Sequence, residues 1–140
     1  MPMRKPFVLP NYEPESTAPL PPIEVLRDAA ASLTARTNRR VEGSVFTGSL
    51  GGTGVYRHTF YLRAPALDDF TDPLFYAWHG AELYPVNVCM AGSAGDKAGS
   101  FADENALHDE VQRILTSEVA RQRIGAMLAQ VGRRSRTATA

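Results

Sequence analysis

The sequence predicts a two-layer α+β fold: a four-stranded antiparallel β-meander with one N-terminal helix and two C-terminal helices packed on one face. Three observations lead to this prediction. Apolar residues recur every three or four positions near both ends of the chain, which is typical of amphipathic helices. Between these segments apolar and polar residues alternate, as in half-buried strands. The connections between the expected strands are short, which favours antiparallel neighbours and the element order α-β-β-β-β-α-α.

The first 21 residues form a proline-rich leader. Its prolines remove backbone donors and fix φ, so neither a helix nor a central strand is expected there. Phe7, Val8 and Leu9 are apolar enough to dock on the body, and the leader is otherwise flexible. A helix is expected to begin at Pro22, which suits a first turn, and to run to about Thr37. Its apolar stripe consists of Ile23, Leu26, Ala30 and Leu33.

Four strands are expected next. They cover Val41–Leu50, Val55–Ala64, Leu74–His79 and Tyr84–Met90, and the glycines of 51–54 supply the positive φ angles of the first hairpin. In the second strand Tyr56, His58, Phe60 and Leu62 are assigned to the helix-covered side. In the third strand Leu74, Tyr76 and Trp78 are assigned to that side, with Phe75, Ala77 and His79 opposite. In the fourth strand the inward set is Tyr84, Val86, Val88 and Met90.

Two helices close the predicted domain, which spans residues 22–132. After a glycine-rich loop at 91–100, Ser100 and Asp103 resemble a capping box for the second helix. Ser117 is expected to cap the third helix, and Gly132 is expected to end it. Residues 133–140 are predicted to form a basic disordered tail. The apolar faces of these helices carry Leu107, Val111, Ile114 and Leu115, and Ala120, Ile124, Leu128 and Val131.

Composition and charge limit the classes of function. A chain of 140 residues is one domain by length and can bury a core without metals or disulfides. No apolar run approaches the ~20 residues that cross a bilayer. The single cysteine, Cys89, fits a reducing compartment, so a cytoplasmic location is expected. The net charge is zero, but three of the 15 basic side chains lie in the last eight residues. The rest of the chain therefore carries an excess of three acidic groups, which argues against nucleic-acid binding.

Catalytic and metal-binding patterns are weak. His79 and Glu82 flank an expected turn and are the only candidates for a catalytic acid–base pair, but no motif places a nucleophile beside them. His58, His79, Cys89 and His108 lack the close spacing of zinc ligands, since the smallest separation is ten residues. The glycine-rich loop at 92–100 does not match a phosphate-binding pattern. The expectation is that the chain uses no metal and no cofactor.

Partner binding is the favoured function. If the helices cover one face of the sheet, the other displays Arg57, Tyr61 and Arg63, together with Phe75 and Asn87. An acidic loop with Asp68, Asp69, Phe70 and Asp72 is expected to extend this surface. The sequence therefore predicts a non-enzymatic module that binds another protein or a second copy of itself, for example an inhibitor or immunity-type protein that occludes its partner. The alternatives are a small enzyme that uses His79 and Glu82, and a nucleic-acid-binding accessory domain.

Overall fold

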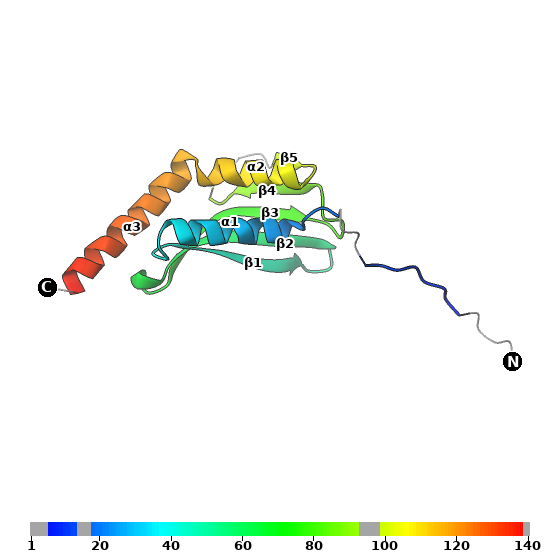
Figure 1. Ribbon diagram of the computed structural model, residues 1–140, viewed down its shortest axis with the longest axis horizontal. Coiled ribbons are helices and arrows are strands. Elements are labelled where there is room, and N and C mark those ends of the chain that lie inside the picture. Colours follow the sequence, from blue (N-terminus) through cyan, green and yellow to red (C-terminus); the bar gives the residue numbers. More distant parts are fainter. Residues whose placement is uncertain (1–5, 14–17, 93–98, 139–140) are drawn as a thin grey trace.

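The computed structural model describes residues 6–13, 18–92 and 99–138, without the side chains of 134–138. It confirms the predicted fold class, with a helix, an antiparallel sheet and two further helices in that order (Figure 1). The sheet has five strands rather than four. The elements are α1 (Pro22–Arg36), β1 (Glu42–Leu50), β2 (Val55–Ala64), the 3-10 turn η1 (Pro65–Leu67), β3 (Phe70–His79), β4 (Val86–Met90), β5 (Gly99–Phe101), α2 (Glu104–Leu115) and α3 (Glu118–Ala138).

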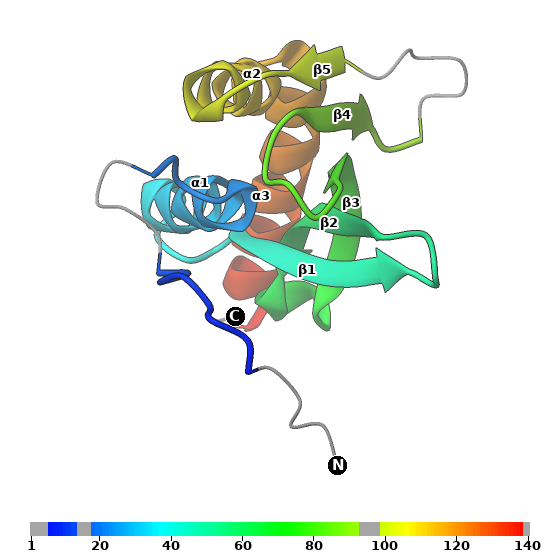
Figure 2. The ribbon, with the colours of Figure 1, turned by 90° about the vertical axis from the view of Figure 1, so that its right-hand side faces the viewer.

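The strands form one sheet in the order β1-β2-β3-β4-β5, and every neighbouring pair is antiparallel. Figure 2 shows α1 and α2 side by side on one face of this sheet, with α3 crossing behind them at one end. The other face, here called the open face, is not covered by any helix of the described residues. The leader residues 6–13 run away from the body (Figure 1).

The starts of α1 and α3 follow the sequence signals. Pro22 occupies the first turn of α1, and the helix ends at Arg36, before Asn38 adopts a positive φ of 54°. The expected capping box of Ser100 and Asp103 is wrong, because Ser100 lies in a strand and Asp103 is itself the N-cap of α2, where its side chain accepts a hydrogen bond from the Ala106 amide. Ser117 accepts one from the Ala120 amide at the start of α3. The predicted end of α3 at Gly132 is wrong, because the helix backbone continues to Ala138 through the segment assigned to a tail. One glycine in a helix costs only ~1 kcal/mol, and the residues after it favour helix.

The core lies between the sheet and the three helices. The rings of Phe60 and Phe75, on β2 and β3, stack with centroids 5.0 Å apart, and both side chains are fully buried. Around them pack Leu26 from α1, Val86 and Val88 from β4, Leu107 and Ile114 from α2, and Met127 and Val131 from α3. Because all three helices contribute to one cluster, the body folds around a single core.

Gly43 determines how closely α1 approaches β1. A Cβ at this position would lie 2.5 Å from the Cα of Ala30 and 2.9 Å from its carbonyl oxygen. Both of these atoms belong to the backbone of Ala30, which cannot move aside as a flexible side chain can. Glycine is therefore required here for a close contact between helix and strand.

The predicted orientation of β3 is wrong. Phe75 pairs with Phe60, and Ala77 pairs with His58, so Phe75, Ala77 and His79 face the helices. Tyr76 and Trp78 lie on the open face. The register between β2 and β3 shifts between Phe60 and Tyr61, where the pairing steps from Phe75 to Pro73. Leu74 is the extra residue of this β-bulge, and both it and Phe75 are buried. Such an insertion reverses the alternation expected from sequence.

Two further elements differ from the prediction. β3 begins at Phe70 rather than at Leu74, so Phe70 and Asp72 belong to a strand and not to a loop. The short strand β5 covers Gly99–Phe101, part of which was assigned to the glycine-rich loop. The glycine-rich segment 92–100, which does not match a phosphate-binding pattern, lies largely outside the described residues. Among the helices that the structure describes, none combines the length and the apolar character that a membrane span requires.

Candidate functional site

The open face is defined by the strand register. Because side chains alternate along a strand, the residues paired with Arg57, Thr59, Tyr61 and Arg63 point the same way. Thr59 has only 3% of its surface exposed, although no described helix covers it, so the neighbouring side chains of this face lie over it. The open face consists of Glu42, Ser44, Phe46, Gly48 and Leu50 of β1, Val55, Arg57, Thr59, Tyr61 and Arg63 of β2, Thr71, Pro73, Tyr76 and Trp78 of β3, and Asn87 and Cys89 of β4.

Arg57 lies at the aromatic centre of this face. Its guanidinium carbon is 5.1 Å from the centroid of the Tyr76 ring, within the range of a cation–π interaction. Trp78 is the direct cross-strand neighbour of Arg57. Arg57 itself is exposed, whereas Tyr76 and Trp78 are half-buried. The stacked arrangement orients the guanidinium and leaves its donors accessible to a ligand.

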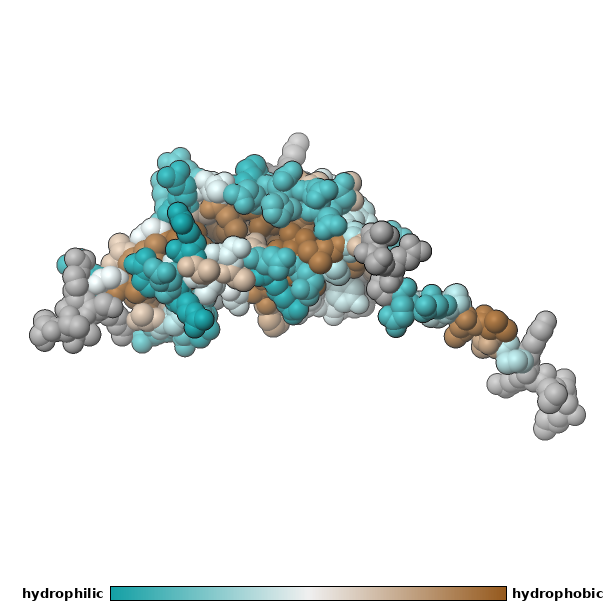
Figure 3. All heavy atoms as spheres, viewed as in Figure 1, coloured by the Kyte–Doolittle hydropathy of each residue, from teal (hydrophilic) through white to brown (hydrophobic). Residues whose placement is uncertain are grey.

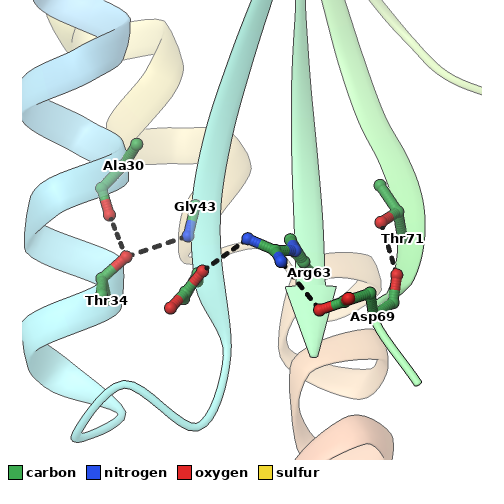
Figure 4. A network of polar contacts seen from close by, with 7 residues as sticks. Ala30, Thr34, Gly43, Arg63, Asp69 and Thr71 are labelled. Carbon is green, nitrogen blue, oxygen red and sulfur yellow. Dashed lines mark hydrogen bonds and ion pairs between the residues drawn. The ribbon is translucent and has the colours of Figure 1, made fainter. Parts of the chain in front are cut away.

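Arg63 occupies a different environment at one end of the same face (Figure 4). One guanidinium nitrogen, Nη1, lies 3.3 Å from Glu42 Oε2, and Nη2 lies 2.7 Å from Asp69 Oδ1. Asp69 reaches Arg63 because Asp68 and Asp69 both adopt positive φ angles, 56° and 57°, in the tight turn after η1. Aspartate tolerates this left-handed conformation better than most residues. Two carboxylates around one guanidinium make this end of the face acidic rather than basic.

The predicted acidic extension of the site is only partly on this surface. Asp68 and Asp69 lie in the turn, and Asp69 joins the open face through Arg63. Asp72 instead pairs with Leu62 on the helix-covered side, and its carboxylate lies 3.7 Å from Arg123 of α3. Phe70 is exposed but pairs with the buried Ala64, so it too lies on the opposite side from Arg63. The earlier start of β3 explains why these two residues leave the predicted surface.

Apolar groups complete the open face. Phe46 of β1 is 65% exposed, and Leu50 near the hairpin is also exposed. Tyr61 is half-buried and faces away from the helices, as the strand alternation predicts. Phe75, which the sequence placed on this surface, is in the core. Asn87 lies on the open face as predicted, opposite Trp78.

A chain of polar contacts links β1, β2 and β3 on the covered side. The Thr47 hydroxyl lies 2.8 Å from His58 Nδ1, and His58 Nε2 lies 2.8 Å from His79 Nε2. His79 Nδ1 lies 2.8 Å from the carbonyl oxygen of Gly80. A carbonyl only accepts, so His79 Nδ1 carries a proton and His79 Nε2 accepts from His58. Thr47 then donates to His58, and all three contacts are satisfied with both imidazoles neutral.

Burial favours the neutral form of His58. His58 is 3% exposed and His79 is 7% exposed. Loss of hydration, followed by the nearby His79 and the positive charge of Arg27 on α1, lowers the pKa of His58 from 6.5 to about 4. Sequence reasoning placed His58 on the covered side of its strand but missed this pair, because the β-bulge that brings His79 to the same side has no sequence signal.

The predicted pairing of His79 with Glu82 is not what the geometry favours. Both ring nitrogens of His79 already have partners, His58 and the Gly80 carbonyl. Glu82 is exposed and lines an open groove together with His79, Trp78 and Tyr84, but no hydrogen bond or ion pair joins the described side chains of Glu82 and His79. The third histidine, His108 on α2, is exposed, and its Nδ1 lies 3.6 Å from Oδ1 of the adjacent Asp109. In the described part of the chain, no three His, Cys, Asp or Glu side chains converge as metal ligands would.

A second hollow lies between α1 and α2. Its volume is about 210 Å³, and it is lined by Leu20, Val25, Ala29, Val111 and Leu115 with Asp28, Glu104 and His108 among the polar residues. Figure 3 shows hydrophobic atoms between the two hydrophilic helix surfaces. Nearby, the hydroxyl of Tyr84 donates to the Leu20 carbonyl at 2.6 Å, which ties the end of the leader to the body. Burial, with Glu104 and Asp103 adding negative charge, raises the pKa of Tyr84 to about 12.

Comparison of the chain with protein-family models, with curated proteins and with solved structures gave no match. The function is therefore argued from the residues of the open face and from their geometry.

Proposed function

We propose that this chain is a protein-binding module that recognises a partner protein with the open face of its sheet. The observation that carries the proposal is the cluster of Arg57, Tyr76 and Trp78 on a face that no described helix covers. Tryptophan, tyrosine and arginine are the residues that most often dominate binding energy at protein interfaces. Here they stand on paired strands, so little conformational entropy remains to be lost on binding.

The charges of the face indicate the chemistry of the partner. Arg57 is stacked on an aromatic ring, whereas Arg63 is paired with Glu42 and Asp69. A complementary surface would place a carboxylate opposite Arg57, an apolar group against Trp78 and Phe46, and a basic group near Asp68 and Asp69. This mixture of charges fits a protein better than a nucleic acid, whose phosphates would meet the acidic end of the face.

An inhibitor or immunity-type role follows naturally from this arrangement. A sheet face of a small domain can cover a site on a partner without undergoing any chemistry itself. The engaged nitrogens of His79 give no specific support to an acid–base mechanism with Glu82. The role of the module would then be to block its partner at equal stoichiometry.

Binding is tested with matched variants of the open face and of the helix side. Full-length chains carrying Arg57→Ala, Tyr61→Ala or Trp78→Ala are compared with Arg121→Ala, which removes an exposed arginine from α3. Proteins captured from the native cell are quantified for each variant, and the affinity of the purified partner is measured by calorimetry. Loss of an interface anchor typically costs ~1–3 kcal/mol, which is ~5- to 150-fold in affinity. Arg121→Ala should bind like the wild type.

Three outcomes would count against the proposal. Unchanged binding by all three open-face variants would remove this face from the interface. Equal loss by Arg121→Ala would indicate non-specific adhesion. Capture that is abolished by nuclease would instead favour the nucleic-acid alternative. An added charge test is Asp68→Lys with Asp69→Lys, which should chiefly slow association and change its salt dependence.

A further inference from the structure

Strand β1 is an edge of the sheet, and the direction of its free backbone groups can be derived. The Gly43 amide donates to the Thr34 hydroxyl of α1 at 3.0 Å, so it points away from β2 (Figure 4). In a regular antiparallel pair, every second residue directs both its N–H and its C=O away from the neighbouring strand. The β1–β2 register is uninterrupted from Glu42 to Leu50. Val45, Thr47 and Ser49 therefore present their backbone donors and acceptors outward.

Within residues 6–13, 18–92 and 99–138, nothing gives this edge the usual protection against pairing. Natural edge strands are shielded by charged side chains, prolines, bulges or a covering element. Residues 43–50, Gly-Ser-Val-Phe-Thr-Gly-Ser-Leu, contain no charged residue and no proline. Among the outward backbone groups of β1 in the described part of the chain, the Gly43 amide is the one that donates to α1. Beyond it, a groove of about 460 Å³ runs between the helix and the strand, lined by Ala30, Ala31, Thr34 and Ala35 with Val45, and by Arg27 and Arg39.

We propose that β1 pairs antiparallel with β1 of a second copy of this chain, so that two five-stranded sheets join into one. The free outward residues set the register. Centring the pairing on Thr47 places Val45 opposite Ser49 of the second copy and Thr47 opposite Thr47, and each of these pairs exchanges two backbone hydrogen bonds. The small side chains of Ala31 and Ala35 leave room beside the edge for the incoming strand.

The side chains are self-complementary in this register. Phe46, which is 65% exposed, falls opposite Gly48 of the second copy, and Ser44 falls opposite Leu50. An aromatic ring placed across from a glycine shields the exposed backbone and is a stabilising cross-strand pair. In its own chain the Phe46 ring already lies 3.6 Å from the position that a Cβ of Gly48 would take, so the Phe46 rings of both copies would lie beside the two glycines. Of the two arginines that line the groove, Arg27 is paired with Glu24 at 3.2 Å.

The test is self-association of the full chain, with one variant that acts only at the edge. Ser49→Pro removes an outward donor without removing any hydrogen bond to β2, and proline is tolerated at outward positions of edge strands. The wild type should show twice the 15.3 kDa mass of one chain in light scattering as concentration rises. Ser49→Pro and Phe46→Ala should weaken the dimer by at least about tenfold. Arg121→Ala, which removes an exposed arginine from α3, should leave it unchanged.

Amide hydrogen exchange keeps the test decisive even if a variant folds poorly. In the wild type, exchange at Val45, Thr47 and Ser49 should slow as concentration increases. A monomer at near-millimolar concentration, with fast exchange at these three amides, would overturn the proposal. Protection that is independent of concentration and lost on deletion of residues 1–13 would also overturn it, because the chain's own leader would then cover the edge.

Discussion

The buried histidine pair predicts a specific loss of stability in acid. The perturbation is a decrease in pH from above 6.5 to about 4, the range over which unfolded and folded His58 differ in protonation. The unfolded chain binds a proton that the folded chain excludes, because the imidazole is buried beside His79 and faces the charge of Arg27. The contribution of His58 to stability is therefore complete above pH 6.5 and declines as the pH falls towards 4.

The size of this effect follows from linkage. Each pH unit between the two pKa values of one group changes the free energy of unfolding by ~1.4 kcal/mol. The pKa of His58 falls from 6.5 to about 4, so the loss attributable to this single side chain is about 3 kcal/mol. A change of that size is a large fraction of the total stability of a domain of this size.

Urea denaturation across this pH range, followed by circular dichroism, measures the effect. His58→Gln is the informative variant, because a glutamine amide can donate to His79 and accept from Thr47 without titrating. The stability of the wild type relative to His58→Gln should fall by about 3 kcal/mol as the pH decreases from above 6.5 to about 4. His108→Gln removes a histidine whose side chain is 70% exposed and serves as the control. Parallel pH profiles for wild type and His58→Gln would refute the reasoning.

Three further predictions follow from packing and hydrogen bonding. Gly43→Ala should destabilise the fold by ~1–3 kcal/mol in urea, because its Cβ would meet the Ala30 backbone, whereas Gly48→Ala should have a much smaller effect. Phe75→Ala should cost ~3–5 kcal/mol by the same measurement, since Phe75 is fully buried against Phe60, and a small effect would place it back on the surface. Ultraviolet titration should show one tyrosine ionising at about pH 12, and Tyr84→Phe should remove that transition.

The helices and most strands could be predicted because their signals are local. Pro22 and Ser117 mark the starts of α1 and α3, and the glycines of 51–54 mark the first hairpin. The alternation in β2 correctly separated Phe60 and Leu62 from Tyr61 and Arg63. The orientation of β3 could not be predicted, because it depends on a bulge opposite Phe60 and Tyr61. A bulge is fixed by pairing between strands and leaves no pattern within one of them.

The candidate surface was predicted correctly on β2 and at Asn87 of β4, but not on β3. Arg57, Tyr61 and Arg63 lie on the open face, whereas Phe70 and Asp72 lie on the opposite side because β3 begins earlier than expected. Tyr76 and Trp78 were assigned to the core, since large aromatic residues are more often buried than exposed. Their place beside Arg57 became visible only from the cross-strand register.

The contacts that run from Thr47 through His58 and His79 to the Gly80 carbonyl also give the sheet a unique alignment. Apolar residues alone would specify the β1–β2 pairing weakly, because β1 contains two glycines and several small polar residues. A slip of one residue along β2 would move His58 to the open face and bring Arg57 under the helices. It would also leave Nε2 of the buried His79 without a hydrogen-bond partner, at a cost of ~1–3 kcal/mol. The polar chain thus discriminates against misaligned sheets, so that the strand with the weakest hydrophobic pattern is held in place by its hydrogen bonds.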